Sequence, residues 1–172
     1  MKSLKKAFKR EDGSATIEFV ILFPAILTLF FSAFEVSIYL TRSVMLERAV
    51  DLNVRLLRLG TLEPATQDEL KRRICEDTLI FRDCPNAIMV ELREISTDSW
   101  QMPDTGLVCV DREEEVQPAV TFNFGRRNEV MLVRACAVLN PFFGTTPFVM
   151  DLPRDPSGGH MITAVSTFVN EP

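Results

Sequence analysis

The sequence has little positive charge for its size. Its 172 residues include 19 Lys and Arg against 24 Asp and Glu, a formal net charge of −5. A protein that binds nucleic acid needs a basic surface to neutralise phosphates, so nucleic acid is excluded as the main partner. The basic residues are also unevenly spread: residues 1–13 hold five Lys or Arg and only two acidic residues. The chain therefore has a basic head and an acidic body.

The residue patterns of enzymes and cofactor sites are missing as well. There is one histidine, His160, no serine motif that pairs with it, and no glycine-rich phosphate loop. The acidic run at residues 111–115 lacks the alternating ligands of a calcium loop, so a solvated loop is favoured. The cysteines stand too far apart for a structural zinc site. We expect no enzymatic activity, no cofactor and no metal.

Cysteine is absent before residue 75, and four cysteines follow: Cys75, Cys84, Cys109 and Cys136. If this part of the chain is exported, an even number predicts two disulfides, for which three connectivities exist. We favour Cys75–Cys84 and Cys109–Cys136. The first pair would join the end of a helix to the start of a strand, and the second would join two strands.

No charge occurs from Phe19 to Phe34, and a wider segment, residues 14–41, is mainly apolar. A membrane-spanning helix needs roughly 20 such residues, so residues 14–41 are predicted to span a membrane if Glu18 and Glu35 are tolerated near its ends. Glu35 would face a partner helix or, as we favour, mark the border of the membrane. Lys and Arg stay on the cytoplasmic side. We therefore expect a bacterial inner-membrane protein with a cytoplasmic N-terminus and a periplasmic body.

The helical pattern continues past the apolar segment. Apolar residues recur on one face over residues 42–60, and Gly60 is a stop signal. One helix of about 46 residues, or ~70 Å, would serve as anchor and stalk. Pro24 removes a backbone hydrogen bond and is expected to kink it. Since the helix continues, we favour an anchor over a cleaved secretory signal.

Residues 61–172 are predicted to form an α+β domain. Thr66 would cap a second helix, with Glu69 as its capping-box partner and Leu70 and Ile74 facing inward. The Phe-rich stretch at residues 141–148 would pack into the core, in preference to a membrane or a partner subunit. A small antiparallel sheet is expected from the strand candidates at residues 88–95, 107–110, 119–124, 129–139 and 161–169.

The N-terminal residues resemble a known family. A basic leader, Gly13, and then Glu18 as the fifth residue after it resemble type IV prepilins and pseudopilins. More specifically, the run SATIEFVILFP at residues 14–24 is similar to the signature of TadE-like (TadE/TadF) proteins of the tight-adherence (Flp) type IVb pilus system. The ending FVNEP at residues 168–172 is similar to that of many such chains.

The resemblance implies a pilin-like fold and a role as a minor pilin or pseudopilin in pilus assembly and adhesion. It implies cleavage between Gly13 and Ser14 by a prepilin peptidase, which removes the leader at residues 1–13. It also implies that Glu18 offsets a free α-amino group during assembly, and that the partners are other pilin subunits and the assembly platform. The alternative is an uncleaved single-pass periplasmic scaffold or binding protein.

Overall fold

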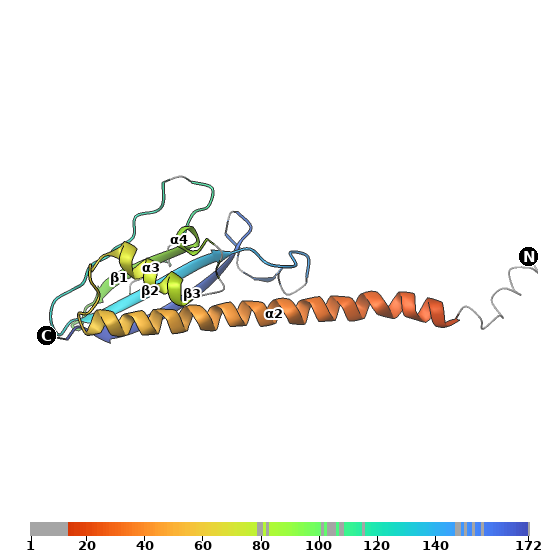
Figure 1. Ribbon diagram of the computed structural model, residues 1–172, viewed down its shortest axis with the longest axis horizontal. Coiled ribbons are helices and arrows are strands. Elements are labelled where there is room, and N and C mark those ends of the chain that lie inside the picture. The colour runs from red at the N-terminus through yellow and green to blue at the C-terminus, as the bar shows by residue number, and fades with distance from the viewer. Residues whose placement is uncertain are drawn as a thin grey trace, which may run out of the picture.

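The protein has an α+β fold in which one long helix lies along a small antiparallel sheet and extends far beyond it (Figure 1). The computed structural model describes residues 14–78, 81, 83–100, 102, 106, 109–114, 116–146, 149, 151–152, 154–155 and 157–171. Its elements are α2 (Ser14–Arg58), α3 (Gln67–Asp77), α4 (Cys84–Ala87), β1 (Ile88–Ile95), β2 (Val130–Leu139) and β3 (His160–Val169). The predicted fold class is confirmed.

Helix α2 is continuous over 45 residues, about 68 Å at 1.5 Å per residue. It runs through Pro24 without interruption, so the kink expected there stays a prediction. The helix ends where the sequence predicts. Gly60 has a φ of +64°, its N–H donates to the Leu57 carbonyl, and the Thr61 N–H donates to the Leu56 carbonyl, both at 3.0 Å. This is a Schellman motif, in which a left-handed glycine satisfies the last helical carbonyls.

Helix α3 begins at Gln67 and is capped by Thr66, whose hydroxyl accepts a hydrogen bond from the Glu69 N–H at 3.2 Å. Only half of the predicted capping box forms. The Thr66 N–H donates to the Pro64 carbonyl at 2.9 Å, and the Glu69 carboxylate instead accepts hydrogen bonds from Arg72 and Arg73. Two arginines one turn away compete successfully for this carboxylate because ionic hydrogen bonds are the stronger ones.

The sheet has the order β1-β2-β3, with both pairs antiparallel. The strands predicted at residues 88–95, 129–139 and 161–169 are confirmed to within one residue. The strand predicted at residues 119–124 is wrong, since only Phe122 forms a bridge, parallel to Leu92 of β1. Pro118 on one side and Gly125, with a φ of +64°, on the other leave a short extended piece between them. Of residues 107–110, the first two lie outside the described residues and the other two form no strand.

The core lies between one face of the sheet and the C-terminal half of α2, with α3 at the side. Leu70 and Ile74 of α3 are fully buried, as their spacing predicts. Most of the remaining core comes from α2 and from alternate positions of the strands: Leu46, Ala49, Val50, Val54, Leu57, Ile88, Val90, Leu92, Met131, Val133, Ala135, Ala137, Leu139, Ile162, Ala164 and Phe168.

Candidate functional site

Most of the N-terminal half of α2 projects beyond the domain (Figure 1). Ile17, Ile21 and Leu29 are 62–72% exposed, and most other large apolar side chains of this half are exposed as well. By length and composition, α2 is the one helix in the described part of the chain that could cross a membrane. Exposing so much contiguous apolar surface to water is unfavourable, so this half of α2 needs an apolar surrounding.

The residues of the N-terminal signature lie at the tip of this helix. Gly13 lies outside the described residues, and Ser14 is the first residue of α2. Glu18 follows one turn later and is exposed. Pro24 lies inside the apolar half, where its carbonyl accepts a hydrogen bond from the Thr28 hydroxyl at 2.8 Å.

At the other end of the apolar half, Glu35 is 4% exposed and binds the connection between β2 and β3. One carboxylate oxygen accepts from the Phe142 N–H at 3.0 Å and the other from the Phe143 N–H at 2.8 Å. Two backbone donors compensate the desolvation that a buried carboxylate suffers. The sequence predicts that Glu35 faces a partner helix or marks the border of the membrane. Neither prediction anticipated that Glu35 binds the β2–β3 connection of its own chain.

The aromatic residues around Glu35 join the β2–β3 connection to α2. The Phe143 ring lies 4.6 Å from the Phe31 ring and 5.9 Å from the Phe34 ring, between centroids. Phe142 lies 6.2 Å from Phe34 and is 61% exposed. The predicted core role of these two phenylalanines is therefore wrong. Asn140-Pro141 ends β2 and turns the chain onto α2, away from the sheet core. Pro147 and Phe148 lie outside the described residues.

Arg42 lies two turns further along α2 and strengthens the same junction. Its Nη1 donates to the Asn140 carbonyl at 3.1 Å, and its guanidinium lies 5.5 Å from the centre of the Phe142 ring. Such cation–π contacts are worth about 0.5–1 kcal/mol at exposed sites. Glu35 and Arg42 together fix where the connection meets the helix.

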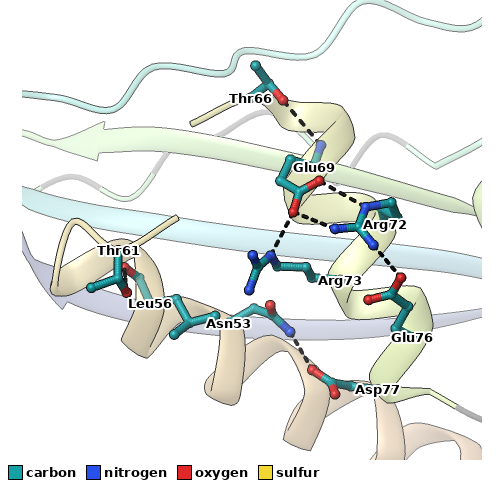
Figure 2. Close-up of polar contacts among 9 residues, drawn as sticks. All are labelled: Asn53, Leu56, Thr61, Thr66, Glu69, Arg72, Arg73, Glu76 and Asp77. Carbon is teal, nitrogen blue, oxygen red and sulfur yellow. Dashed lines mark hydrogen bonds and ion pairs between the residues drawn. The ribbon is translucent and has the colours of Figure 1, made fainter. Parts of the chain in front are cut away.

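A second polar junction, far from the apolar half, joins α2 to α3 (Figure 2). Asn53 of α2 is 1% exposed, and its Nδ2 donates to the Ala49 carbonyl and to Asp77 of α3, both at 2.8 Å. The sequence analysis missed Asn53. The available signal was an amide on the apolar face of the stalk, one turn after Ala49 and one turn before Leu57.

A third polar cluster, also missed, lies on the sheet. Glu91 of β1 is 5% exposed and stands directly across from Arg134 of β2. Arg134 Nε donates to Glu91 at 2.9 Å, and Arg93 Nε lies 2.7 Å from the same carboxylate. Both arginines bind the one carboxylate within the sheet, so the cluster fixes strand register and leaves no free carboxylate for catalysis.

The structure contains the two disulfides that the spacing favours. Cys75 at the end of α3 is joined to Cys84 at the start of α4, and Cys109 is joined to Cys136 of β2. Cys109 lies in an irregular segment, so the second bond attaches a loop to the sheet instead of joining two strands.

A cavity of about 870 Å³ lies beside α4 and the end of β2. Its lining includes both cations and carboxylates, among them Lys71, Asp83, Arg112 and Glu114. Arg112 is already engaged, with Nε donating to Ser157 and Nη1 to Asn140, both at 2.7 Å. The described lining contains no serine, cysteine or histidine, so it offers no nucleophile paired with a base.

His160 is the first residue of β3 and is 4% exposed. In the acidic run at residues 111–114, Asp111 accepts from the Glu113 N–H at 2.9 Å, as in a solvated turn. Among the described residues, no group of three His, Cys, Asp or Glu is placed to hold a metal ion.

A model of the family described as TadE-like protein matches residues 13–51. The matched range contains the exposed apolar half of α2, together with Glu18 and Glu35, and continues into the buried half past Leu46 and Val50. Comparisons with curated proteins and with solved structures give no match. The match thus concerns the N-terminal helix and says nothing of the sheet. Over residues 13–51, the chain is therefore similar to TadE-like proteins, a family of pilus-associated structural proteins.

Proposed function

We propose that the chain is a minor pilin or pseudopilin of the tight-adherence (Flp) type IVb pilus system. Residues 14–41 would anchor it in the bacterial inner membrane, residues 42–60 would form a stalk, and residues 61–172 would form a periplasmic domain. The observation that carries the proposal is the division of α2, in which one continuous helix has an exposed apolar half and a half buried in a domain. Lipid covers such a surface before assembly, and neighbouring helices cover it afterwards.

Cleavage after Gly13 by a prepilin peptidase would remove the leader at residues 1–13. Ser14, the residue that would follow the cut, is the first described residue of α2. Glycine at this position lets an extended chain enter a protease site, because it has no side chain to obstruct the approach. The basic residues of the leader would then be lost, and Ser14 would become the new N-terminus.

Glu18 would pair with a free α-amino group of a neighbouring subunit. It lies four residues after Ser14, one helical turn into the apolar half of α2. A carboxylate in an apolar assembly is costly without a partner charge, so the pair would favour one register between subunits. The proposed partners are accordingly other pilin subunits and the platform that assembles them.

Intact-mass measurement tests the processing step. In cells that contain the prepilin peptidase we expect wild-type protein to lack residues 1–13, and Gly13→Arg to keep them. Gly106→Arg is the matched control with the same mass change, because Gly106 is exposed and has nothing within 4 Å of an added Cβ. If wild type and G13R both keep the full-length mass, the processing claim fails and the uncleaved scaffold protein is the better description.

Pilus assembly tests the role of Glu18. We expect Glu18→Gln to be processed and membrane-bound but to be lost from sheared pili or from the assembly complex, because its neutral amide cannot offset an ammonium group. Glu47→Gln, an exposed glutamate on the same helix, should behave as wild type. Normal incorporation of E18Q would contradict the pairing.

A further inference from the structure

The segment that Glu35 holds, Pro141–Thr146, lies at the end of the apolar half of α2. Phe142 is 61% exposed, and it meets Phe34, itself 44% exposed. Phe30, one turn before Phe34, is 62% exposed. The exposed apolar surface of the helix therefore continues without a break onto the domain, through the β2–β3 connection that reaches α2 beyond the sheet (Figure 1).

The position of this segment follows from the length of the apolar half. The 18 residues from Ile17 to Phe34 rise about 27 Å as a helix, close to the ~30 Å of the hydrocarbon core. When this half crosses the membrane, Phe34 lies at the boundary of the hydrocarbon on the domain's side. Phe142 and Phe143, which contact Phe34, lie at the same level.

The segment is held at this level by the chain itself. Glu35 accepts the Phe142 and Phe143 N–H groups, and Arg42 binds the carbonyl of Asn140. A loop placed in the interface of a bilayer must have its backbone groups satisfied by protein or water. Glu35 satisfies two of them, and the loop in turn shields the carboxylate from the acyl chains. This accounts for a glutamate that follows directly after an apolar run.

We propose that residues 141–146 form a membrane-contacting loop that places the Phe142 side chain in the lipid interface on the domain's side, with Glu35 as its positioning residue. Aromatic side chains gather at this level of a bilayer. The partner is the leaflet that α2 itself crosses, since the loop continues the lipid-facing surface of the helix. The inference rests on the proposed membrane anchoring, and it is independent of processing at Gly13.

The single tryptophan of the chain allows a direct test. In the double variant Trp100→Phe/Phe142→Trp, the only tryptophan lies on the proposed loop. The full chain is reconstituted in phosphatidylcholine vesicles, with and without brominated acyl chains. We expect emission that is blue-shifted and quenched by brominated lipid. Wild type is the control: Trp100 is 69% exposed and follows the end of β1 where Ile95 pairs with Val130, far from the loop after Leu139. It should show neither effect.

A reporter on α2 separates failure of the loop from failure of the anchor. Trp100→Phe/Phe30→Trp places the tryptophan at an exposed position of the apolar half and should be quenched. If this reporter is quenched and the Phe142→Trp reporter is not, the loop inference is overturned while the anchor stands. If neither is quenched, both are overturned. A blue shift at position 142 without quenching by brominated lipid identifies a protein contact and overturns the lipid assignment.

The role of Glu35 is tested in the same reporter. Glu35→Gln leaves one acceptor oxygen for two N–H groups, so we expect weaker quenching of the tryptophan at position 142. Glu47→Gln, exposed on the same helix, should leave the quenching unchanged. Equal quenching in E35Q and E47Q would overturn the positioning role.

Discussion

Three buried polar side chains determine how parts of the chain meet. Glu35, Asn53 and Glu91 are each at most 5% exposed. Glu35 binds two backbone N–H groups, Asn53 binds a carboxylate of another helix, and Glu91 binds arginines within the sheet. A buried polar group without a partner costs about 1–3 kcal/mol, so each of these contacts selects one arrangement over its alternatives.

The contribution of Asn53 can be measured against a similar pair at the surface. Asn53→Ala removes a buried hydrogen bond to Asp77, and we expect it to lower the free energy of unfolding by about 1–3 kcal/mol. Asn86→Ala removes the exposed bond from Asn86 to Asp83 and should stay within about 0.5 kcal/mol. Chemical denaturation of the full chain in detergent checks both. Equal losses would show that burial of the amide contributes nothing.

The pH dependence of stability should carry a contribution from Glu69. Hydrogen bonds from Arg72 and Arg73 lower the pKa of Glu69 from its ordinary value of 4.5 to about 2 (Figure 2). As the pH falls below about 4.5, the unfolded chain binds this proton before the folded one does. The stabilisation is therefore complete above about 4.5 and is lost as the pH falls through about 2.

Thermal unfolding as a function of pH tests this contribution. Glu69→Gln cannot titrate, so its unfolding temperature should fall less than that of wild type between those two pH values. Glu63→Gln replaces an exposed glutamate just before α3 and should follow the wild-type curve. If the unfolding temperatures of E69Q and wild type fall in parallel with pH, the lowered pKa of Glu69 is contradicted.

At the scale of elements, α2 has two halves in opposite environments. Leu46, Val50 and Leu57 are at most 6% exposed against the sheet, whereas residues before Phe34 expose their apolar side chains. The C-terminal half is thus part of the domain core, and the helix continues from that core toward the N-terminus. A movement of the domain would be transmitted along a continuous helix, because no break separates the two halves.

Two leucines on the domain half of α2 test this division. Leu46 is 0% exposed and Leu52 is 48% exposed. Leu46→Ala should cost about 2–5 kcal/mol through lost burial and the cavity left behind, and Leu52→Ala should stay within about 0.5 kcal/mol. Denaturant unfolding of the full chain measures the difference. A similar cost at both positions would mean that α2 packs on the sheet with another face.

At the scale of the whole molecule, a three-stranded sheet and one helix half form a small core, and disulfides attach the rest. Cys75–Cys84 closes a sequence separation of 9 residues between α3 and α4. Cys109–Cys136 closes a separation of 27 residues and ties an irregular segment to β2. A small exported domain gains stability when such cross-links restrict its unfolded chain.

The two disulfides should stabilise the folded protein by different amounts. Chain entropy gives about 2.6 kcal/mol for the shorter loop and about 3.6 kcal/mol for the longer. We therefore expect the Cys109→Ala/Cys136→Ala double variant to unfold at lower denaturant concentration than Cys75→Ala/Cys84→Ala. The reverse order would show that local packing at each bond outweighs loop entropy. Peptide mapping without reduction checks the pairing itself, and four free thiols would contradict it.

The sequence by itself determined the elements whose signals are local. The apolar run and Gly60 set the extent of α2, and Thr66 set the start of α3. Alternation set β1, a mostly apolar run set β2, and the turn at Ser157-Gly158-Gly159 set the start of β3. These signals lie within a few residues of the structure they specify, so they can be recognised without knowing the fold. The family resemblance is local too, since it rests on residues 13–51.

Only the tertiary structure decided which distant segments meet. Glu35 and Phe142 are separated by 107 residues, and Asn53 and Asp77 by 24, so no local pattern pairs them. The fate of the Phe-rich segment was decided in the same way, because the end of β2 directs it onto α2 and not into the core. A buried polar group takes whichever partner the fold brings within hydrogen-bond distance, and that choice depends on the packing of the whole chain.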